Sequence, residues 1–333
     1  MDKNSFNALV VREVSEGKFI REIAQRQISD LPVGEVLIRV KYSSLNYKDA
    51  LSASGHKGVT KKYPHTPGVD AAGIVEESRS SEFKLGEEVI VTGFDLGMNT
   101  SGGFGQYIRV PAGWVIKRPE KLSLKECMIY GTAGFTAALS LWKLEKNDLN
   151  SSKGDVLVTG ATGGVGSMAV AILSKAGYSV SAVTGKAHER DYLLRLGAKE
   201  VISREEMDDK SGKVFLKERW AAVIDTVGGN ILTTALKSTK FGGSVTCCGM
   251  ITSNELKTAI FPFILKGINL LGIASAETPL EIKKEIWERL SRQWKIDSFQ
   301  ESAQECSLGE LNPKIDMILK GQIRGRVFVD LEN

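Results

Sequence analysis

The sequence predicts a two-domain α/β protein, in which a partly open β-barrel precedes a doubly wound parallel sheet. Three observations lead to this prediction. Residues 6–117 contain short apolar runs separated by Gly, Pro, Asn and Asp. From about Leu122 onward, strand patterns alternate with helix patterns, as in parallel sheets. A glycine-rich turn, Gly160–Gly166, follows the first apolar strand of that second region. The chain of 333 residues is long enough for two cores.

The first domain is predicted to consist mainly of strands, with one short helix at Leu45–Ser54. We expect it to span residues 1–122 and to be completed by residues 275–333, because the chain ends in a strand-like run, Val327–Val329. The expected strands are Ala8–Glu13, Glu35–Tyr42, Ala71–Glu76, Glu88–Thr92, Gly105–Val110 and Val115–Lys117.

The second domain, residues 123–274, is predicted to alternate strands and helices. Its expected strands are Val156–Thr159, Ser179–Val183, Glu200–Ile202, Ala222–Asp225, Ser244–Cys248 and Asn269–Ile273. Helices are expected at Lys125–Leu141, Val165–Ala176, His188–Leu196 and Ile231–Ser238, and an amphipathic helix at Leu280–Lys295 follows the domain.

Composition excludes some classes of function. The chain has 44 basic and 40 acidic residues, and a net charge of +4 is too small to indicate nucleic-acid binding. No apolar run is long enough to span a bilayer, and no signal region precedes the first strand, so we expect a soluble cytoplasmic protein. Cys247 and Cys248 are neighbours in an expected strand and point to opposite faces, which disfavours a disulfide.

The glycine-rich turn predicts a dinucleotide site, because such a turn lets backbone N–H groups at a helix N-terminus approach a pyrophosphate. The next strand ends in Thr184-Gly185-Lys186, where an NAD-binding unit usually carries an acid for the ribose 2′-OH. A hydroxyl and a lysine suit a 2′-phosphate instead. The sequence therefore favours NADP(H), with weaker binding of NAD, although Lys186 taken alone reads as an ordinary surface lysine.

Several motifs together resemble the medium-chain dehydrogenase/reductase superfamily over nearly the whole chain. They are Ser44–Leu51 (SLNYKDAL), Pro67–Gly73 (PGVDAAG), Gly131–Ala137 (GTAGFTA), the glycine turn, Asp225–Gly229 (DTVGG) and Pro262–Gly267 (PFILKG). Within that superfamily the chain is similar to the zinc-free quinone oxidoreductase branch, and specifically to the YhdH/YhfP group, which includes acrylyl-CoA reductases. The resemblance implies a GroES-like β-barrel domain and a Rossmann domain.

The glycine pattern also fits short-chain dehydrogenases, but a catalytic Tyr-xxx-Lys is missing. Tyr178 and Tyr192 follow the motif, and the residues four positions after them are Ala182 and Leu196. The segments that hold catalytic zinc in zinc alcohol dehydrogenases match Leu45-Asn46-Tyr47, Val69-Asp70 and Thr132. Because these residues include no Cys or His, we expect no metal.

The resemblance implies hydride transfer from NADPH to a conjugated carbonyl, either a quinone or an acrylyl-CoA-like enoyl thioester. Negative charge then builds on the carbonyl oxygen, which needs a hydrogen-bond donor. The polar candidates are Tyr47, Asn46 and Asp49. Tyr47 is equally compatible with a packing role against the cofactor, and Asp49 is more typical of a helix start, although it could also orient Lys48 or Tyr47. A non-catalytic NADPH-binding sensor or scaffold with the same fold remains the alternative.

The resemblance also assigns cofactor contacts and an oligomeric state. It implies contacts at Tyr47, at the pyrophosphate, around the 2′-phosphate and along the nicotinamide half; the residues other than Tyr47 are Thr162, Gly163, Gly164, Val165, Thr184, Gly185, Lys186, Arg204, Met250, Ile264 and Ser275. Arg204 is equally compatible with a solvated surface position. The apolar run in Leu265–Ile273 predicts an edge strand that pairs with a second copy, which gives a homodimer.

Overall fold

The computed structural model describes residues 4–297 and 302–332, which form two compact units. Unit 1 contains Met1–Thr132, Ala276–Trp287 and Ala303–Asn333, and unit 2 contains Ala133–Ser275 and Glu288–Ser302. In the described chain the first division thus follows Thr132, later than the predicted boundary at Leu122, and residues 288–297 lie in unit 2. The division falls next to Gly131, a non-helical residue inside helix α2 (Leu124–Lys146).

Unit 1 is built on an antiparallel sheet in which β3 has three partners. β3 pairs with β4 and β6 through its first half and with β15 through its last residues. The strand order is β14-β15-β3-β4-β5-β7, with β6 attached to β3. The strands are β3 (Val36–Leu45), β4 (Asp70–Ser78), β5 (Glu88–Thr92), β6 (Tyr107–Val110), β7 (Ile116–Lys117), β14 (Ala303–Ser307) and β15 (Arg326–Asp330).

Alternating apolar residues of these strands form the core of unit 1. Val36, Ile38 and Val40 of β3 point to one face and are almost fully buried. Helix α1 (Tyr47–Ala53) and helix α8 (Leu311–Leu319) pack against this core through Ala50 and Leu311. Packing against the sheet thus fixes the position of α1, whose N-cap is Asn46 and whose first residue is Tyr47.

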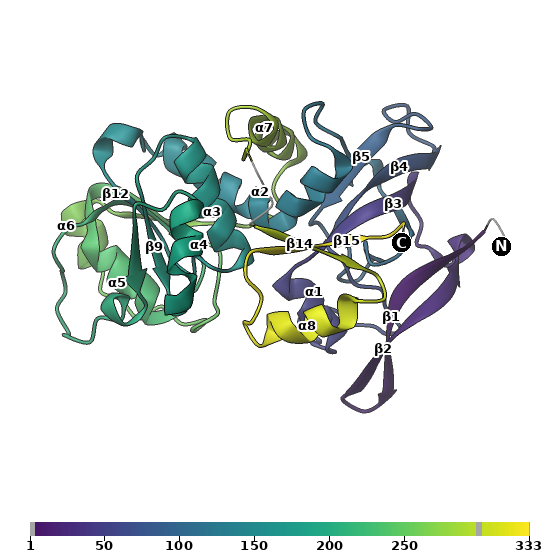
Figure 1. Cartoon of the computed structure of the whole chain (residues 1–333), viewed down its shortest axis with the longest axis horizontal. Helices are drawn as coiled ribbons and strands as arrows, with labels where there is room; N and C mark the ends of the chain where they lie inside the picture. Colours follow the sequence, from purple (N-terminus) through teal and green to yellow (C-terminus); the bar gives the residue numbers. More distant parts are fainter. Residues whose placement is uncertain (1–3, 298–301, 333) are drawn as a thin grey trace. The chain divides into compact units, whose positions relative to one another are not determined.

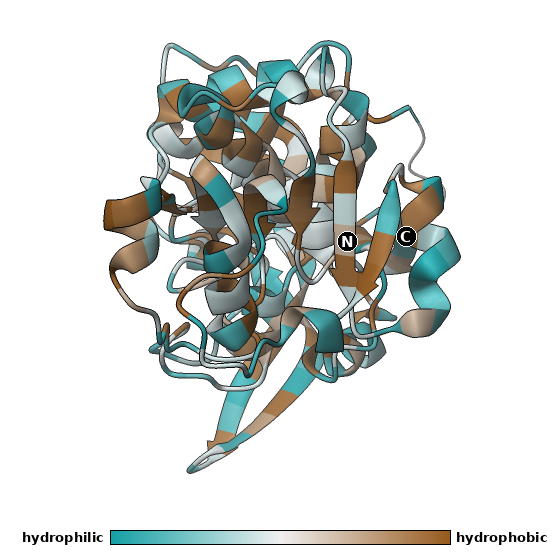
Figure 2. Ribbon diagram, turned by 90° about the vertical axis from the view of Figure 1, so that its left-hand side faces the viewer, coloured by the Kyte–Doolittle hydropathy of each residue, from teal (hydrophilic) through white to brown (hydrophobic). Residues whose placement is uncertain are grey.

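An N-terminal hairpin accompanies unit 1. Strands β1 (Ser5–Ser15) and β2 (Lys18–Gln27) pair in an antiparallel ribbon that turns at Gly17. Figure 2 shows apolar and polar bands alternating along this ribbon, which lies lowest in the view. Its first strand is buried from Ala8 to Val11, whereas Val14 and Ile20 near the turn are exposed.

Unit 2 is a doubly wound parallel sheet. Its strand order is β10-β9-β8-β11-β12-β13, so the chain moves outward in one direction from β8 and then in the other from β11. The strands are β8 (Val156–Val158), β9 (Val180–Thr184), β10 (Glu200–Ser203), β11 (Trp220–Asp225), β12 (Thr239–Cys247) and β13 (Asn269–Gly272). In such a sheet ligands bind beyond the carboxyl ends of the strands where the order reverses.

Helices flank the sheet of unit 2, and Figure 1 shows α3 and α4 on the same side of β9. Those that connect its strands are α3 (Gly164–Lys175), α4 (Arg190–Arg195), α5 (Gly229–Ser238) and α6 (Phe261–Lys266). The chain leaves this sheet through α7 (Leu280–Ser291), of which residues up to Trp287 belong to unit 1. Among the described residues, no helix has the length and apolar character needed to cross a membrane.

The predicted fold class is confirmed, with four elements added. The sequence analysis did not anticipate β2, β14, α6 and α8. β2 alternates weakly because most of its residues are exposed, and α6 has only six residues. The amphipathic helix predicted at Leu280–Lys295 ends earlier, at Ser291. All four cysteines are free, as the sequence suggested.

Candidate functional site

The glycine turn of unit 2 forms an open cradle at the start of a helix. Gly163 is the N-cap of α3, and no side chain caps that end. Gly160 has a φ of +59°, and a Cβ on Gly166 would lie 2.2 Å from the Gly160 carbonyl oxygen. Glycine is therefore required at both positions. The first N–H groups of α3 stay available for an anion such as a pyrophosphate.

The end of the second parallel strand carries donors instead of an acid. The Thr184 hydroxyl lies 3.3 Å from that of Thr162, and it accepts a hydrogen bond from the Lys186 N–H at 3.0 Å. The exposed Arg204 guanidinium lies over Gly185, where a Cβ would meet its Nη2 atom at 2.0 Å. Four of the predicted residues, Thr184, Gly185, Lys186 and Arg204, are thus brought together and fit a phosphate.

The carboxyl ends of β8 and β11 are fastened to each other beside the cradle. The Asp225 carboxylate accepts hydrogen bonds from the Thr159 hydroxyl at 2.7 Å and from the Gly228 N–H at 2.8 Å. The Thr226 hydroxyl donates to the Thr159 carbonyl oxygen at 2.8 Å. Burial raises the pKa of Asp225 to about 6. These contacts hold the turn in register with the strand at which the sheet order reverses.

The three residues assigned to the nicotinamide half lie farther along unit 2. Met250 follows β12, is 68% exposed, and has its Cα near Gly228. Ile264 is 64% exposed on α6, and Ser275 is the last residue of this segment of unit 2. The cofactor role of these three residues stays a prediction.

A buried polar cluster lies in unit 1 at the start of α1. We call it the Asp70 cluster, and it consists of Ser44, Asn46, Asp49, Asp70, Thr132 and Arg326. Asp70 begins β4 and its carboxylate is fully buried. It accepts hydrogen bonds from the Ser44 hydroxyl at 2.5 Å, from the Asn46 amide at 2.8 Å and from the Thr132 hydroxyl at 2.6 Å.

The Asn46 side chain is fully occupied within this cluster. Its Nδ2 atom donates to Asp70 Oδ2 at 2.8 Å and to Asp49 Oδ2 at 3.1 Å, and its Oδ1 accepts from Arg326 at 3.1 Å. Asn46 is 9% exposed. Its amide therefore positions the two carboxylates and is not free to donate to a substrate.

Asp49 is the third residue of α1 and stabilises the start of this helix. Its carboxylate accepts from the Asn46 N–H at 2.8 Å and from the Val69 N–H at 2.8 Å. Asp49 therefore acts on backbone N–H groups and holds the first turn of α1, and its orienting effect on Tyr47 stays a prediction. Burial and the neighbouring Asp70 charge raise the pKa of Asp49 to about 7.

Arg326 enters the cluster from the last strand of the chain. Its guanidinium donates to Ser44 Oγ at 2.9 Å, to the Leu45 carbonyl oxygen at 3.2 Å and to the Ile129 carbonyl oxygen at 3.0 Å. Burial lowers the pKa of Arg326, and the Asp70 and Asp49 charges oppose that shift. This residue was not predicted from the sequence, because nothing in the local pattern of β15 marks a buried charge.

A glycine in α2 allows this approach. Gly131 has a φ of +49°, and a Cβ there would lie 2.4 Å from Ser44 Oγ and 2.8 Å from Arg326 Nη2. The next residue, Thr132, donates its N–H to Asp70 at 2.8 Å. The segment Gly131–Ala137, quoted above as a motif, thus breaks α2 so that its backbone meets the Asp70 cluster.

Tyr47 differs from its neighbours because it is accessible. It is the first residue of α1 and is 47% exposed, whereas Asn46 before it and Asp49 after it are buried. Its phenol can donate a hydrogen bond at neutral pH. Of the three catalytic candidates, Tyr47 alone presents a side chain that a substrate can reach.

The positions that match the zinc ligands of the wider family do come together, but as a hydrogen-bonded set. Asn46 and Thr132 both bind the Asp70 carboxylate, and Val69 offers no ligand atom in its side chain. No group of three His, Cys, Asp or Glu side chains suited to a metal occurs among the described residues. One carboxylate, an amide and a hydroxyl that already bind one another do not fit zinc.

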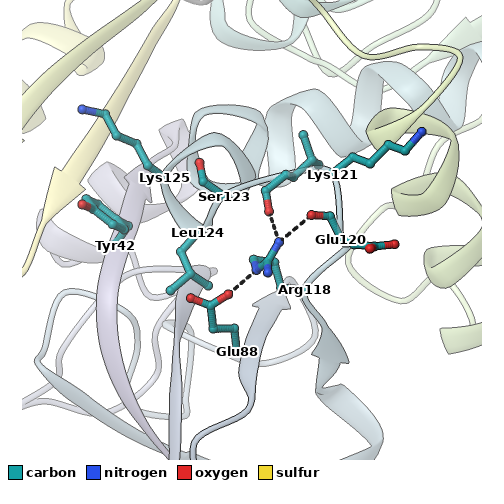
Figure 3. Close-up of a pocket in the computed structure, with 9 residues that line it drawn as sticks. Tyr42, Glu88, Arg118, Glu120, Lys121, Ser123, Leu124 and Lys125 are labelled. Atoms are coloured by element: carbon teal, nitrogen blue, oxygen red, sulfur yellow. Dashed lines mark hydrogen bonds and ion pairs between the residues drawn. The ribbon is translucent and has the colours of Figure 1, made fainter.

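A cavity of unit 1 lies apart from this cluster and is lined by residues between Tyr42 and Lys125 that do not belong to it. It has a volume of about 660 Å³, and Figure 3 shows Arg118 within it, directed toward Glu88 and Glu120. The Arg118 guanidinium forms an ion pair with Glu88 and donates to the Pro119 and Glu120 carbonyl oxygens at 3.0 Å. Because the Arg118 guanidinium is already paired with neighbouring groups, this cavity is a weaker candidate for a functional site than the Asp70 cluster.

Both units match known protein families. Residues 32–120 match the family described as alcohol dehydrogenase GroES-like domain, and residues 164–292 match the one described as zinc-binding dehydrogenase. YhfP of Bacillus subtilis (strain 168), named as a quinone oxidoreductase, is 46% identical over 91% of this chain and 92% of its own length. Acrylyl-CoA reductase AcuI of Ruegeria pomeroyi is 42% identical over 98% of this chain and 99% of its own.

Two solved structures from the same group of proteins closely resemble this chain. The structure of B. subtilis YhfP with NAD bound has a TM-score of 0.96 at 43% identity and covers 99% of this chain and 100% of that one. The YhdH oxidoreductase from Salmonella enterica in complex with NADP has a TM-score of 0.94 at 39% identity, covering 97% and 99%. The chain therefore belongs to the medium-chain dehydrogenase/reductase superfamily, in the group formed by the quinone oxidoreductase and acrylyl-CoA reductase proteins.

Proposed function

We propose that this protein is an NADPH-dependent oxidoreductase that reduces a conjugated carbonyl without a metal, its substrate being a quinone or an acrylyl-CoA-like enoyl thioester. Two findings on relatives support the proposal: YhdH is described with NADP, and AcuI is named an acrylyl-CoA reductase. NAD would bind more weakly. The YhfP structure holds NAD, which is consistent with a pyrophosphate cradle that does not depend on the 2′ group.

The observation that carries the cofactor preference is the strand end at Thr184. An acid for a free ribose hydroxyl is missing there, and the Arg204 guanidinium lies over Gly185, the one residue type that leaves room for it. A phosphate in this position would meet the Arg204 guanidinium and the Thr184 hydroxyl, and Lys186 is the next residue along the chain after Gly185. Charge-assisted hydrogen bonds of this kind are about twice as strong as neutral ones.

Besides the hydride, the reduction needs a hydrogen-bond donor for the developing oxyanion, which unit 1 offers, and a proton for the product, which water provides. When bound, NADPH supplies a hydride to the electrophilic carbon. The Tyr47 hydroxyl donates a hydrogen bond to the carbonyl oxygen on which negative charge develops. Asn46 and Asp49 act through Tyr47: they fix the first turn of α1, and thereby the direction of the phenol.

A turnover assay tests this proposal. We expect NADPH absorbance to fall when acrylyl-CoA, crotonyl-CoA or a member of a quinone panel is added. The order of kcat/KM across the panel names the substrate class. A protein that binds NADPH in titration calorimetry and turns over none of these compounds would instead be a sensor or scaffold.

We propose further that the protein is a homodimer joined at β13. This strand is the edge of the parallel sheet, and Ile264, Leu265 and Leu270 at or beside it are 64%, 59% and 37% exposed. An exposed apolar edge favours pairing with the same strand of a second copy. Light scattering at micromolar concentration should report a dimer, and the variant Leu270→Lys should report a monomer. A monomeric unmodified chain would contradict this assembly.

A further inference from the structure

A lysine is buried in unit 1 at the end of β5. Lys283, on the first turn of α7, is fully buried. Its Nζ atom donates to the Thr92 carbonyl oxygen at 2.5 Å and lies 3.7 Å from the centre of the Phe94 ring. Phe94 is in turn stacked on Trp114, with ring centres 5.4 Å apart. A carbonyl oxygen and an aromatic face are partners of an ammonium ion, so the geometry suits the charged form.

The backbone connects this lysine to the Asp70 cluster. Thr92, which accepts from Lys283, is the direct cross-strand partner of Asp70 in the β4–β5 pair. The next residue, Gly93, donates to the Val69 carbonyl oxygen at 2.9 Å, and a Cβ on Gly93 would lie 3.3 Å from Lys283 Nζ. The Lys283 ammonium, held by helix α7, therefore contacts the end of β5 directly opposite Asp70 on the neighbouring strand β4.

The charges of the cluster do not balance without this lysine. Asp49 and Asp70 are both fully buried, and one Asn46 Nδ2 atom donates to both of them. Arg326 supplies one positive charge. Two buried carboxylates this close repel each other, and an uncompensated buried charge is strongly destabilising. A second cation is needed if both carboxylates are to be ionised.

We propose that Lys283 is this second cation, and that it is a positioning residue of the reaction, because its charge offsets that of Asp70 and thereby favours the ionised form of Asp49, which holds the first turn of α1. The role in the reaction rests on the proposed function. Lys283 acts through the Asp70 cluster and makes no contact with substrate.

Asp49 and Lys283 are both charged only within a narrow pH range. The pKa of Asp49 is raised to about 7 by burial and by Asp70. Burial lowers the pKa of Lys283 to about 8, and the Asp70 and Glu277 charges oppose that shift. Arg326 faces both carboxylates and stays charged. Below the first value Asp49 is neutral, and above the second Lys283 is neutral, so turnover should be maximal between them.

Folding stability should show the opposite trend, because burying charges is unfavourable. The folded-state pKa of Asp49 lies above its usual 3.8, so its contribution to the free energy of unfolding falls as pH rises from 3.8 to about 7. The folded-state pKa of Lys283 lies below its usual 10.5, so its contribution rises as pH rises from about 8 to 10.5. Together these contributions give a minimum in the free energy of unfolding, and it falls in the same pH range as the maximum in turnover.

Three variants test the proposal: Lys283→Met, Lys283→Arg and the control Lys284→Met, whose exposed lysine pairs only with Glu281 in the described chain. In Lys283→Met the acidic limb of the kcat–pH profile should shift to higher pH by about 1 unit, because loss of a nearby positive charge raises the pKa of Asp49. In both Lys283 variants the basic limb near pH 8 should disappear. NADPH affinity should not change, and Lys284→Met should keep both limbs.

Urea unfolding from pH 6 to 10 provides a second readout that needs no turnover. The free energy of unfolding of the unmodified chain, minus that of Lys283→Arg, should rise with pH above about 8. A flat difference, or a basic kcat limb retained in Lys283→Arg, would overturn the proposal. If Lys283→Met does not fold, the arginine variant decides alone. A pH-dependent difference in a protein that reduces no tested substrate would support the charge pairing and reject the proposed function.

Discussion

Replacing Arg326 by methionine should destabilise unit 1 far more than removing a surface arginine. The guanidinium donates to two groups at 2.9 and 3.0 Å and to two more at 3.1 and 3.2 Å, and it faces two buried carboxylates. Methionine matches the length of the stem and supplies no donor. Removing one partner of a buried ion pair costs about 3–5 kcal/mol, because the acceptors and charges left behind have no access to water.

The assay is urea unfolding followed by tryptophan fluorescence at pH 7.5, with Arg109→Met as the matched control. Arg109 pairs with Glu77, which is 60% exposed, so this pair should contribute less than about 1 kcal/mol. We expect a lower midpoint at unchanged slope for Arg326→Met. Equal losses in the two variants would refute the idea that Arg326 compensates the buried carboxylates.

Three further predictions concern the site itself. Tyr47→Phe keeps the ring and removes the hydroxyl, so kcat should fall by about 10- to 1,000-fold with NADPH affinity nearly unchanged; an unaltered kcat would leave Tyr47 a packing role. Arg204→Ala should weaken NADPH binding by about tenfold in calorimetry and leave NADH binding unchanged, because the contact is charge-assisted but exposed; equal weakening of both cofactors would contradict a 2′-phosphate contact. Elemental analysis after dialysis should show substoichiometric zinc, and chelators should leave turnover intact; an equimolar zinc required for activity would contradict a metal-free site.

The fold and the glycine turn of unit 2 could be predicted from the sequence because their signals are local. The glycine turn, the strand end at Thr184 and the alternation of strands and helices each lie within a few residues of one another. The structure adds the one long-range fact that a Cβ at Gly185 would collide with Arg204. Both residues were already named as candidates from their positions.

The buried cluster of unit 1 could be predicted only in part. Asp70, Thr132 and Gly131 lie in motifs that the sequence made visible, but their shared contact depends on a helix break and a strand pairing. Arg326 and Lys283 come from the C-terminal part of the chain, and their burial follows from pairing with β3 and β5. A charged residue in an amphipathic helix or a short strand is usually solvated, so nothing local identified either one.

The central claim, hydride transfer from NADPH to a conjugated carbonyl, is tested most directly with NADPH deuterated at C4 on each face in turn. Acrylyl-CoA and a quinone would be the two acceptors, and mass spectrometry of the products would locate the label. We predict that one of the two labelled cofactors transfers deuterium, to the β carbon of the thioester or, for the quinone, with a primary isotope effect on turnover. Binding of NADPH without transfer of label or loss of its absorbance, under all these conditions, would contradict the account.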